Sequence, residues 1–193
     1  MLRNVHKYKV VLGSQSPRRR ALLAGLGLEF EVRTLPDIDE SFPPSMPADQ
    51  IPRYIALQKA SAYLPTLAEN ELLITADTIV HLQRTLLGKP AGKDDAIRML
   101  RLLSGRTHQV VTGVCMCTRE KTVSFAVTSS VRFAPLEEED IQYYVDHFHP
   151  YDKAGAYGIQ EWIGYVAVEG IEGSFYNVMG LPIQKVYQEL TRF

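Results

Sequence analysis

The sequence near its start predicts a buried strand that passes directly into a helix. The apolar run Val10-Val11-Leu12 is typical of the end of a buried strand, and Gly13 permits a tight turn after it. Ser16 is suited to the N-cap of a helix, and Pro17 is suited to its first position. Residues 10–23 therefore indicate a strand-to-helix turn, which is a unit of folds that pack helices against a sheet.

Consecutive arginines fill the first turn of this predicted helix. The helix macrodipole already places partial positive charge there, so Arg18, Arg19 and Arg20 cost about 0.3–1 kcal/mol each. The cost disappears if an anion binds at the helix end. The backbone N–H groups, the hydroxyls of Ser14 and Ser16 and the guanidinium groups would together bind phosphate. The alternative is that the arginines extend into water from an exposed turn.

The next part of the chain alternates between strand and helix patterns. Residues 28–34 alternate like a strand, and residues 36–44 form an acidic, proline-rich loop that is suited to deliver the side chain of Glu40. Apolar residues then recur at helical spacing over residues 48–64. That helix carries Lys59, which on a surface helix is normally solvated.

Residues 72–82 are the most sheet-like stretch of the sequence, yet Asp77 and Thr78 stand at its centre. A carboxylate in a buried strand is costly unless it is paired or belongs to a site, which favours a functional role for Asp77. A hairpin after this strand would return the chain through residues 86–90 and place Lys89 near Asp77.

The remaining elements complete an α/β pattern. We expect a helix over residues 93–103, adjacent long strands over 108–117 and 121–133, a helix that opens at Pro135, a short strand over 165–168, and a closing helix from 180 to 190. This order predicts a mixed α/β sheet with helices packed around it.

The cysteines and two late histidines give no metal-binding pattern. Cys115 and Cys117 alternate in a strand-like run, so both thiols should point to the same face, too close along one strand for an ordinary disulfide. We expect buried or half-buried thiols. His147 and His149 have no matching partners for a metal site and are interpreted as loop residues.

Composition limits the classes of partner. The chain has 193 residues, of which 46% are hydrophobic, enough for a core in one domain or in two closely joined lobes. Its 21 Lys and Arg residues and 22 acidic residues leave a formal net charge of −1, so any positive site must be local. There is no signal-peptide pattern at the N-terminus and no apolar run long enough for a bilayer. We therefore expect a cytoplasmic protein with no membrane partner.

Six short motifs give the chain a resemblance to a known family. They are Ser14-Gln15-Ser16-Pro17-Arg18-Arg19, Glu40, Lys59, Ala76-Asp77-Thr78, Gly88-Lys89-Pro90 and Asp152-Lys153-Ala154-Gly155-Ala156-Tyr157-Gly158-Ile159-Gln160. In order and spacing they resemble the Maf family of nucleoside triphosphate pyrophosphatases over residues 11–181. The sequence contains neither a phosphate-binding loop of the Gly-x-x-x-x-Gly-Lys-Ser/Thr type nor Gly-x-Gly-x-x-Gly, which argues against the common ATPase and dinucleotide folds.

The resemblance implies a fold, an assembly and an activity. The implied fold is the elongated, two-lobed inosine-triphosphatase-like (Maf/Ham1) fold with a central cleft, as a single domain over residues 1–193 without a separable linker. A homodimer is implied as well. The implied reaction is attack of water at the α-phosphate of a nucleoside triphosphate, which releases a nucleoside monophosphate and pyrophosphate.

The resemblance and the residue chemistry together assign roles. Asp77 would accept the proton of the attacking water. Glu40 and Asp77 would be drawn to a divalent metal cation, Mg²⁺ or Mn²⁺, that bridges phosphate oxygens. The residues expected to bind substrate are Ser14, Ser16, Arg18, Arg19, Lys59, Thr78, Lys89 and Gln160.

The nucleobase is expected to be thymine or uracil. At Arg18, Thr78 and Gln160 the chain resembles the subgroup that cleaves dTTP and UTP, whereas the 7-methyl-GTP subgroup typically carries an aromatic residue at the position of Arg18. The Gln160 amide can pair with O4 and N3–H of thymine or uracil, but rotated it would equally suit cytosine.

Two alternatives remain open at this point. One is a non-enzymatic nucleotide-binding or nucleic-acid-binding regulator linked to septum formation, the phenotype behind the family name. That role should leave a broad basic face with interleaved aromatic residues, whereas the arginines here are concentrated in one turn, so no stable nucleic-acid partner is expected. The other is a pyrophosphatase with a different base preference.

Overall fold

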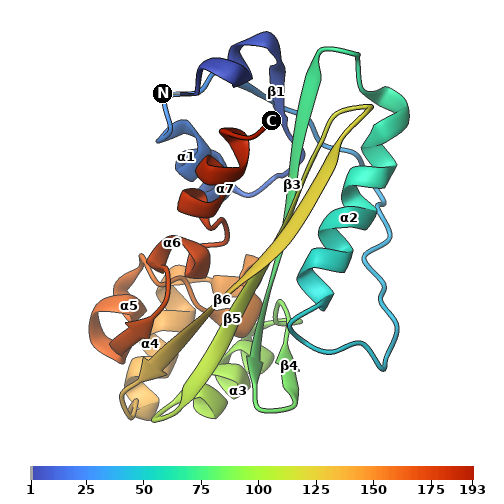
Figure 1. Ribbon diagram of the computed structural model, residues 1–193. Coiled ribbons are helices and arrows are strands. Elements are labelled where there is room, and N and C mark those ends of the chain that lie inside the picture. The colour runs from blue at the N-terminus through green and yellow to red at the C-terminus, as the bar shows by residue number, and fades with distance from the viewer. Residues whose placement is uncertain (1) are drawn as a thin grey trace. The chain divides into compact units, whose positions relative to one another are not determined.

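The computed structural model describes residues 2–193, and of Arg3 only the backbone (Figure 1). Met1, which belongs to the predicted single domain, lies outside the described residues. With η for 3₁₀ helices, the elements are η1 (Arg3–Lys7), β1 (Lys9–Leu12), α1 (Pro17–Ala24), β2 (Phe30–Val32), α2 (Ile51–Tyr63), η2 (Leu64–Thr66), β3 (Glu71–Leu82), β4 (Thr85–Leu87), α3 (Lys93–Leu103), β5 (Thr107–Cys117), β6 (Thr122–Phe133), α4 (Glu138–Phe148), η3 (Pro150–Asp152), η4 (Ala154–Ala156), α5 (Trp162–Ala167), β7 (Val168–Glu172), α6 (Phe175–Val178) and α7 (Ile183–Leu190).

The strands of residues 2–193 form a mixed sheet of seven strands. The order is β2-β1-β3-β5-β6-β7, and β4 pairs with β3 outside this path. Strand β1 is parallel to both β2 and β3, whereas the β3–β4 and β6–β7 pairs are antiparallel. A mixed sheet with flanking helices is the predicted fold class, which is confirmed.

The chain divides into two compact units. Unit 1 comprises the chain up to Asp77, Thr112–Val127 and Gly180–Phe193, and unit 2 comprises Thr78–Val111 and Thr128–Met179. Strands β3, β5 and β6 each contribute residues to both units. The expectation of one domain without a separable linker stays a prediction.

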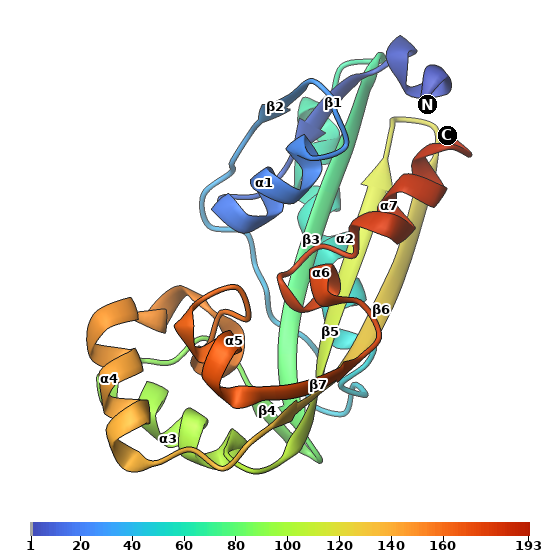
Figure 2. The same cartoon turned by 90° about the vertical axis from the view of Figure 1, so that its left-hand side faces the viewer.

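Alternation along β1 distributes the core of unit 1 over two faces of its sheet. Val10 and Leu12 pack in a cluster that includes Leu23 of α1 and Val186 of α7. Val11 points the other way, into a cluster with residues of α2. Helices α1 and α7 accordingly lie on one side of these strands and α2 lies on the other (Figure 1, Figure 2).

The cysteines follow the same alternation. Cys115 and Cys117 are both buried in the cluster that faces α2, and both are free thiols. The predicted shared face and the burial are therefore confirmed.

Unit 2 has a hydrophobic cluster of its own. Helices α3, α4 and α5 contribute Leu100, Tyr144 and Ile163, and strand β6 contributes Phe133. Helix α3 begins and ends where the sequence predicts, with Asp94 and Asp95 in its first turn.

The strand predicted at residues 165–168 is wrong, because Trp162–Ala167 form helix α5 and β7 follows it. Aromatic and β-branched residues raise strand propensity here. In the helix, however, Tyr165 is 81% exposed, while Ile163 and Ala167 lie four residues apart and are fully buried. Burial at helical spacing therefore overrides local propensity.

The helix predicted to open at Pro135 begins later, at Glu138, with Glu137 at the N-cap. The N–H of Leu136 donates instead to the Ser104 hydroxyl at 2.8 Å, which ties the preceding segment to the end of α3. The acidic residues still fall in the first turn, where negative charge is favoured.

Smaller differences concern short elements. His147, interpreted as a loop residue, lies in the last turn of α4, and His149 caps that helix in the left-handed conformation. Helix α6 is too short to leave a periodic signal and was not expected. Strand β2 is shorter than the predicted 28–34. In the part of the chain that the structure describes, no helix has the length and apolar character needed to span a membrane.

Candidate active site

The turn after β1 packs tightly against its neighbours in unit 1. A Cβ atom on Gly13 would lie 3.0 Å from Cγ2 of Thr75 and 3.1 Å from Cε2 of Tyr63, so glycine allows the turn to approach β3 and α2 closely. The Ser16 hydroxyl accepts the N–H of Arg19 at 3.4 Å, which confirms the predicted N-cap.

The two serine hydroxyls are already used as acceptors. Ser14 Oγ accepts the N–H of Ser16 at 3.2 Å, and Ser16 Oγ accepts the N–H of Arg19. Two of the N–H groups expected to bind phosphate are therefore used within the turn. The hydroxyl protons can still be donated to an anion, because a hydroxyl both accepts and donates.

Arg19 is half-buried and donates hydrogen bonds to two backbone carbonyls. Its Nε donates to the carbonyl of Gly180 and its Nη1 to that of Ala76, both at 2.8 Å. Burial lowers the pKa of Arg19, whereas the charges of Asp77 and Glu40 act to raise it. An arginine in a protein stays protonated, so this side chain places a fixed positive charge beside two carboxylates.

The alternative that the arginines extend into water holds only for one of them. Arg20 is exposed, whereas Arg18 is half-buried like Arg19 and lowers the pKa of Arg19 through charge repulsion. The two arginines of the family motif are therefore both partly buried and close enough for their charges to interact.

Lys59 pairs with the two predicted metal ligands. Its Nζ lies 2.9 Å from Oδ1 of Asp77 and 3.0 Å from Oε1 of Glu40. The Lys59 and Asp77 side chains are 12% and 13% exposed, whereas that of Glu40 is 52% exposed. The helix α2, the strand β3 and the loop after β2 thus bring their charged groups to one point of unit 1.

Two buried contacts that sequence reasoning missed fix α2 against the sheet. Thr75 Oγ1 donates to the carbonyl of Ala56 at 2.7 Å. Thr75 precedes Asp77 by two residues on β3, and Ala56 precedes Lys59 by three residues on α2. On β5, a Cβ atom on Gly113 would lie 2.1 Å from the backbone nitrogen of Arg53. Thr75 is the polar residue in an otherwise apolar run, and this signal was available in the sequence.

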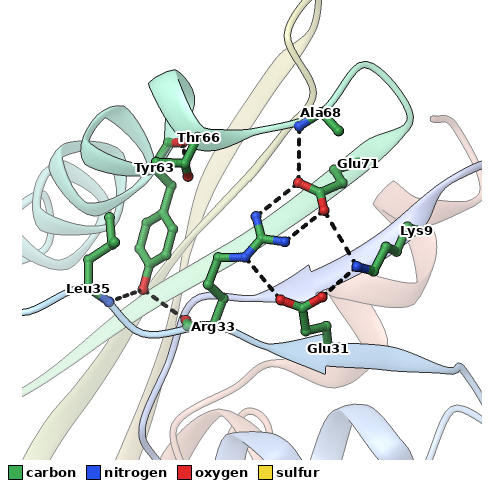
Figure 3. A network of polar contacts seen from close by, with 8 residues as sticks. All are labelled: Lys9, Glu31, Arg33, Leu35, Tyr63, Thr66, Ala68 and Glu71. Atoms are coloured by element: carbon green, nitrogen blue, oxygen red, sulfur yellow. Dashed lines mark hydrogen bonds and ion pairs between the residues drawn. The ribbon is translucent and has the colours of Figure 1, made fainter.

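A polar network anchors the start of the loop that carries Glu40 (Figure 3). Arg33 donates to both carboxylate oxygens of Glu71, at 2.9 and 2.7 Å, and to Glu31 at 3.0 Å. The hydroxyl of Tyr63 donates to the Arg33 carbonyl at 2.9 Å and accepts the N–H of Leu35 at 3.0 Å. Strand β3 and helix α2 therefore hold the loop where it leaves β2.

The other predicted substrate residues belong to unit 2. Thr78 follows Asp77 on β3 and is half-buried, and Lys89 is exposed after β4. The register pairs Val80 with Leu87, so the predicted hairpin is confirmed, while the proximity of Lys89 to Asp77 stays a prediction.

Gln160 is half-buried, and its Oε1 is fully buried with no hydrogen-bond partner among residues 2–193. A buried carbonyl oxygen of this kind normally has a donor. The Gln160 side chain therefore has a buried acceptor that is available for a donor from outside the described chain.

Among the described residues, no three His, Cys, Asp or Glu side chains come together to hold a metal ion. Asp77 and Glu40 nevertheless face the same ammonium group. Mg²⁺ is usually bound by one or two carboxylates together with substrate phosphates and water, and this pair matches that donor set.

A family model described as Maf-like protein matches residues 9–193. The chain belongs to this family. A dTTP/UTP pyrophosphatase of Parabacteroides distasonis is 61% identical over 193 residues, with full coverage of both chains. Proteins of the same name from Bacteroides fragilis (58% identity, 98% of each chain) and Porphyromonas gingivalis (55% identity, 100% of this chain and 98% of the other) are also similar.

The fold has a solved relative. The structure of a HAM1 protein from Coxiella burnetii matches with a TM-score of 0.51 at 14% identity, over 96% of this chain and 100% of the other. This likeness confirms the Ham1-like fold that the motifs implied.

Proposed function

We propose that the protein hydrolyses dTTP and UTP to the nucleoside monophosphate and pyrophosphate. The similarity to relatives named dTTP/UTP pyrophosphatases supports this activity. The observation that carries it is the charged cluster of unit 1. In this cluster Lys59 pairs with Asp77 and Glu40, and the charges of both carboxylates act to raise the pKa of Arg19.

The cations are proposed to bind the triphosphate. Arg18 and Arg19 present guanidinium groups suited to phosphate, and Ser14 and Ser16 retain hydroxyl protons for its oxygens. Lys59 can donate to a phosphate oxygen as well, because an ammonium group has three donors and the two carboxylates occupy two of them. Lys89, which is exposed, is proposed as a further phosphate contact.

Asp77 is proposed as the general base. Its carboxylate accepts a proton from water while the water oxygen bonds to the α-phosphorus, and the bond from that phosphorus to the oxygen bridging to the β-phosphate breaks. The leaving pyrophosphate takes the bonding electrons, and neighbouring cations stabilise its charge. Burial of Asp77 next to Lys59 keeps the carboxylate in one position for this transfer.

A divalent cation fits the same carboxylates. Glu40 and Asp77 would hold Mg²⁺ or Mn²⁺ together with phosphate oxygens. When bound, such an ion polarises the phosphate and neutralises its charge.

Gln160 is proposed to read the base. Its unpartnered Oε1 can accept N3–H of thymine or uracil, and its amide N–H can donate to O4. Cytosine presents an acceptor at N3 and would leave Oε1 unsatisfied in this orientation. Thr78 is proposed as a second contact on the substrate. The homodimer implied by the family resemblance also stays a proposal, which light scattering would test against the chain mass of 21.7 kDa.

The test is product analysis with matched variants. Purified protein with Mg²⁺ is given dTTP, UTP, CTP, dCTP, GTP, ATP or 7-methyl-GTP, and pyrophosphate and orthophosphate are measured separately. We expect pyrophosphate, with dTTP and UTP giving the highest kcat/KM. Asp77→Asn should lower kcat by roughly 10²–10⁴-fold, the contribution of a positioned base.

Asp146→Asn is the control, because it makes the same change in an exposed ion pair with Lys93 on the surface. It should leave kcat unchanged. Orthophosphate as the first product, a purine nucleotide ranking first, or an Asp77→Asn variant as active as wild type would each contradict the proposal.

A further inference from the structure

A buried polar network surrounds the turn that presents Gln160. The N–H of Glu161 donates to the Gly158 carbonyl at 2.9 Å, which closes a four-residue turn with Gln160 at its third position. The N–H of Gly158 donates in turn to the hydroxyl oxygen of Tyr144 at 3.0 Å. The first residue of the turn is therefore bound to helix α4.

The last residue of the turn is bound to the same hydroxyl. Tyr144 donates its proton to Oε2 of Glu161, while Oε1 of Glu161 lies 3.1 Å from Nζ of Lys153. Tyr144 is fully buried and Lys153 is 8% exposed. One tyrosine hydroxyl thus joins both ends of the turn, and one lysine secures the carboxylate.

There is little room for the turn to adopt another arrangement. A Cβ atom on Gly158 would lie 2.8 Å from Cδ of Glu161 and 3.0 Å from Cε of Lys153. Upstream, the hydroxyl of Tyr157 is 2.7 Å from Nε2 of the buried His108. The chain on the N-terminal side of the turn is therefore held as well.

These contacts matter because an amide can pair in two ways. Rotating the Gln160 amide by half a turn exchanges its donor and acceptor and would convert a site for thymine into one for cytosine. A turn that is held in one position fixes where the amide meets the base and which groups surround it, so that one of the two orientations can be favoured. In the orientation that the structure shows, the carbonyl oxygen Oε1 of Gln160 is buried and has no hydrogen-bond donor among the described residues.

We propose that Tyr144 and Glu161 are positioning residues that fix the Gln160 turn and thereby set the preference for thymine and uracil over cytosine. This inference rests on the proposed function, in which Gln160 reads the base. Neither residue is proposed to touch the substrate. Their effect should therefore appear in the choice between bases and not only in the overall rate.

The chain offers a closely matched pair of variants. Tyr144→Phe removes only the buried hydroxyl, and Tyr143→Phe makes the same change at the neighbouring residue of α4, which is 44% exposed. We measure kcat/KM for dTTP and dCTP, and for UTP and CTP. Tyr144→Phe should lower the dTTP:dCTP and UTP:CTP ratios at least about tenfold, within the range that one unsatisfied buried polar group costs. Tyr143→Phe should leave both ratios unchanged.

A second pair guards against loss of folding in Tyr144→Phe. Glu161→Gln removes the charge that pairs with Lys153, and Glu169→Gln makes the same change in an exposed pair with Arg132. Only Glu161→Gln should lower the ratios. Circular dichroism establishes that each variant is folded at the assay temperature.

The outcomes separate the inference from the proposed function. If the wild type cleaves no pyrimidine triphosphate to pyrophosphate, the proposed function fails and this inference fails with it. If the wild type is active and folded variants at Tyr144 and Glu161 lose rate equally for thymine and cytosine nucleotides, the inference alone is overturned, because the network is then only structural.

Discussion

At the scale of single residues, a buried carboxylate with a strongly lowered pKa, Glu71, lies outside the proposed catalytic cluster. Glu71 is 4% exposed, and its hydrogen bonds from Arg33 lower its pKa to about 2. The same contacts raise the pKa of Arg33. Glu71 begins strand β3, which carries Asp77, and its partner Arg33 precedes the loop that carries Glu40 (Figure 3). Its ionisation therefore bears on the stability of the region that holds both carboxylates.

This lowered pKa predicts a specific loss of stability in acid. The pKa of Glu71 is about 2 in the folded protein and 4.5 ordinarily, so the stabilisation is fully present above about pH 4.5 and is lost as the pH falls toward 2. Its size is on the order of 3 kcal/mol, since each pKa unit corresponds to about 1.4 kcal/mol. In urea unfolding at pH 7, the free energy of unfolding of Glu71→Gln should be lower than that of the wild type by this amount. The difference should shrink below pH 4.5.

Glu138→Gln is the matched control for this experiment. The pKa of Glu138 is also lowered to about 2, by Arg101, but the pair lies on the surface, with side chains 52% and 56% exposed. Surface ion pairs contribute little because water and salt screen them. Equal effects of the two substitutions would contradict the role of burial.

At the scale of elements, the position of helix α2 decides where Lys59 lies. The first turn of α2 meets β5 at Gly113, where an added Cβ would overlap the backbone of Pro52 and Arg53 at 2.1–2.3 Å. Backbone cannot rotate away as a flexible side chain can. Glycine at this one position therefore permits the helix to pack as closely as it does.

Gly113→Ala should displace α2 and weaken both stability and activity. We expect a loss of roughly 1–3 kcal/mol in the free energy of unfolding, typical of overpacking, and a fall in kcat as Lys59 moves from Asp77. Gly92→Ala is the control, because a Cβ there meets nothing within 4 Å. Chemical denaturation and dTTP hydrolysis measure the two effects. Wild-type stability in Gly113→Ala would show that the helix adjusts without cost.

The elements also show what local pattern can and cannot predict. Helix α3 was predicted to the residue because its apolar spacing, acidic first turn and terminal Ser104 agree. The end of helix α5 lies in the stretch predicted as a strand, residues 165–168, because the exposed Tyr165 and Val166 have strand propensity. Only packing in the folded chain shows that Ile163 and Ala167 are its buried face.

The candidate site likewise has residues that the sequence indicated and contacts that it did not. The motifs pointed to Arg19, Lys59 and Asp77, but no spacing in the sequence indicates that Lys59 bridges Asp77 and Glu40. Tyr144 lies 17 residues before Glu161 and outside every motif. Contacts between distant parts of the chain carry no local signal, so the network around Gln160 could not be predicted from the sequence.

At the scale of the whole molecule, each unit has its own core, but the two units share three long strands. Unit 1 contains the clusters around Leu12 and Val11, and unit 2 contains the cluster around Phe133. Strands β3, β5 and β6 nevertheless pass without interruption from one unit into the other. Domains that unfold separately are normally joined by flexible linkers that few contacts cross, and continuous strands are the opposite case.

We therefore predict that the two units unfold in one cooperative transition. Trp162, the one tryptophan of the chain, lies in unit 2 and reports the unfolding of that unit by fluorescence, while far-ultraviolet circular dichroism reports both units. The two midpoints in urea should coincide. Gly113→Ala, a change in unit 1, should lower the Trp162 midpoint as much as the circular dichroism midpoint, because loss of the shared strands in one unit removes them from the other. A Trp162 transition that stays at its wild-type midpoint in this variant would show that unit 2 folds independently of unit 1.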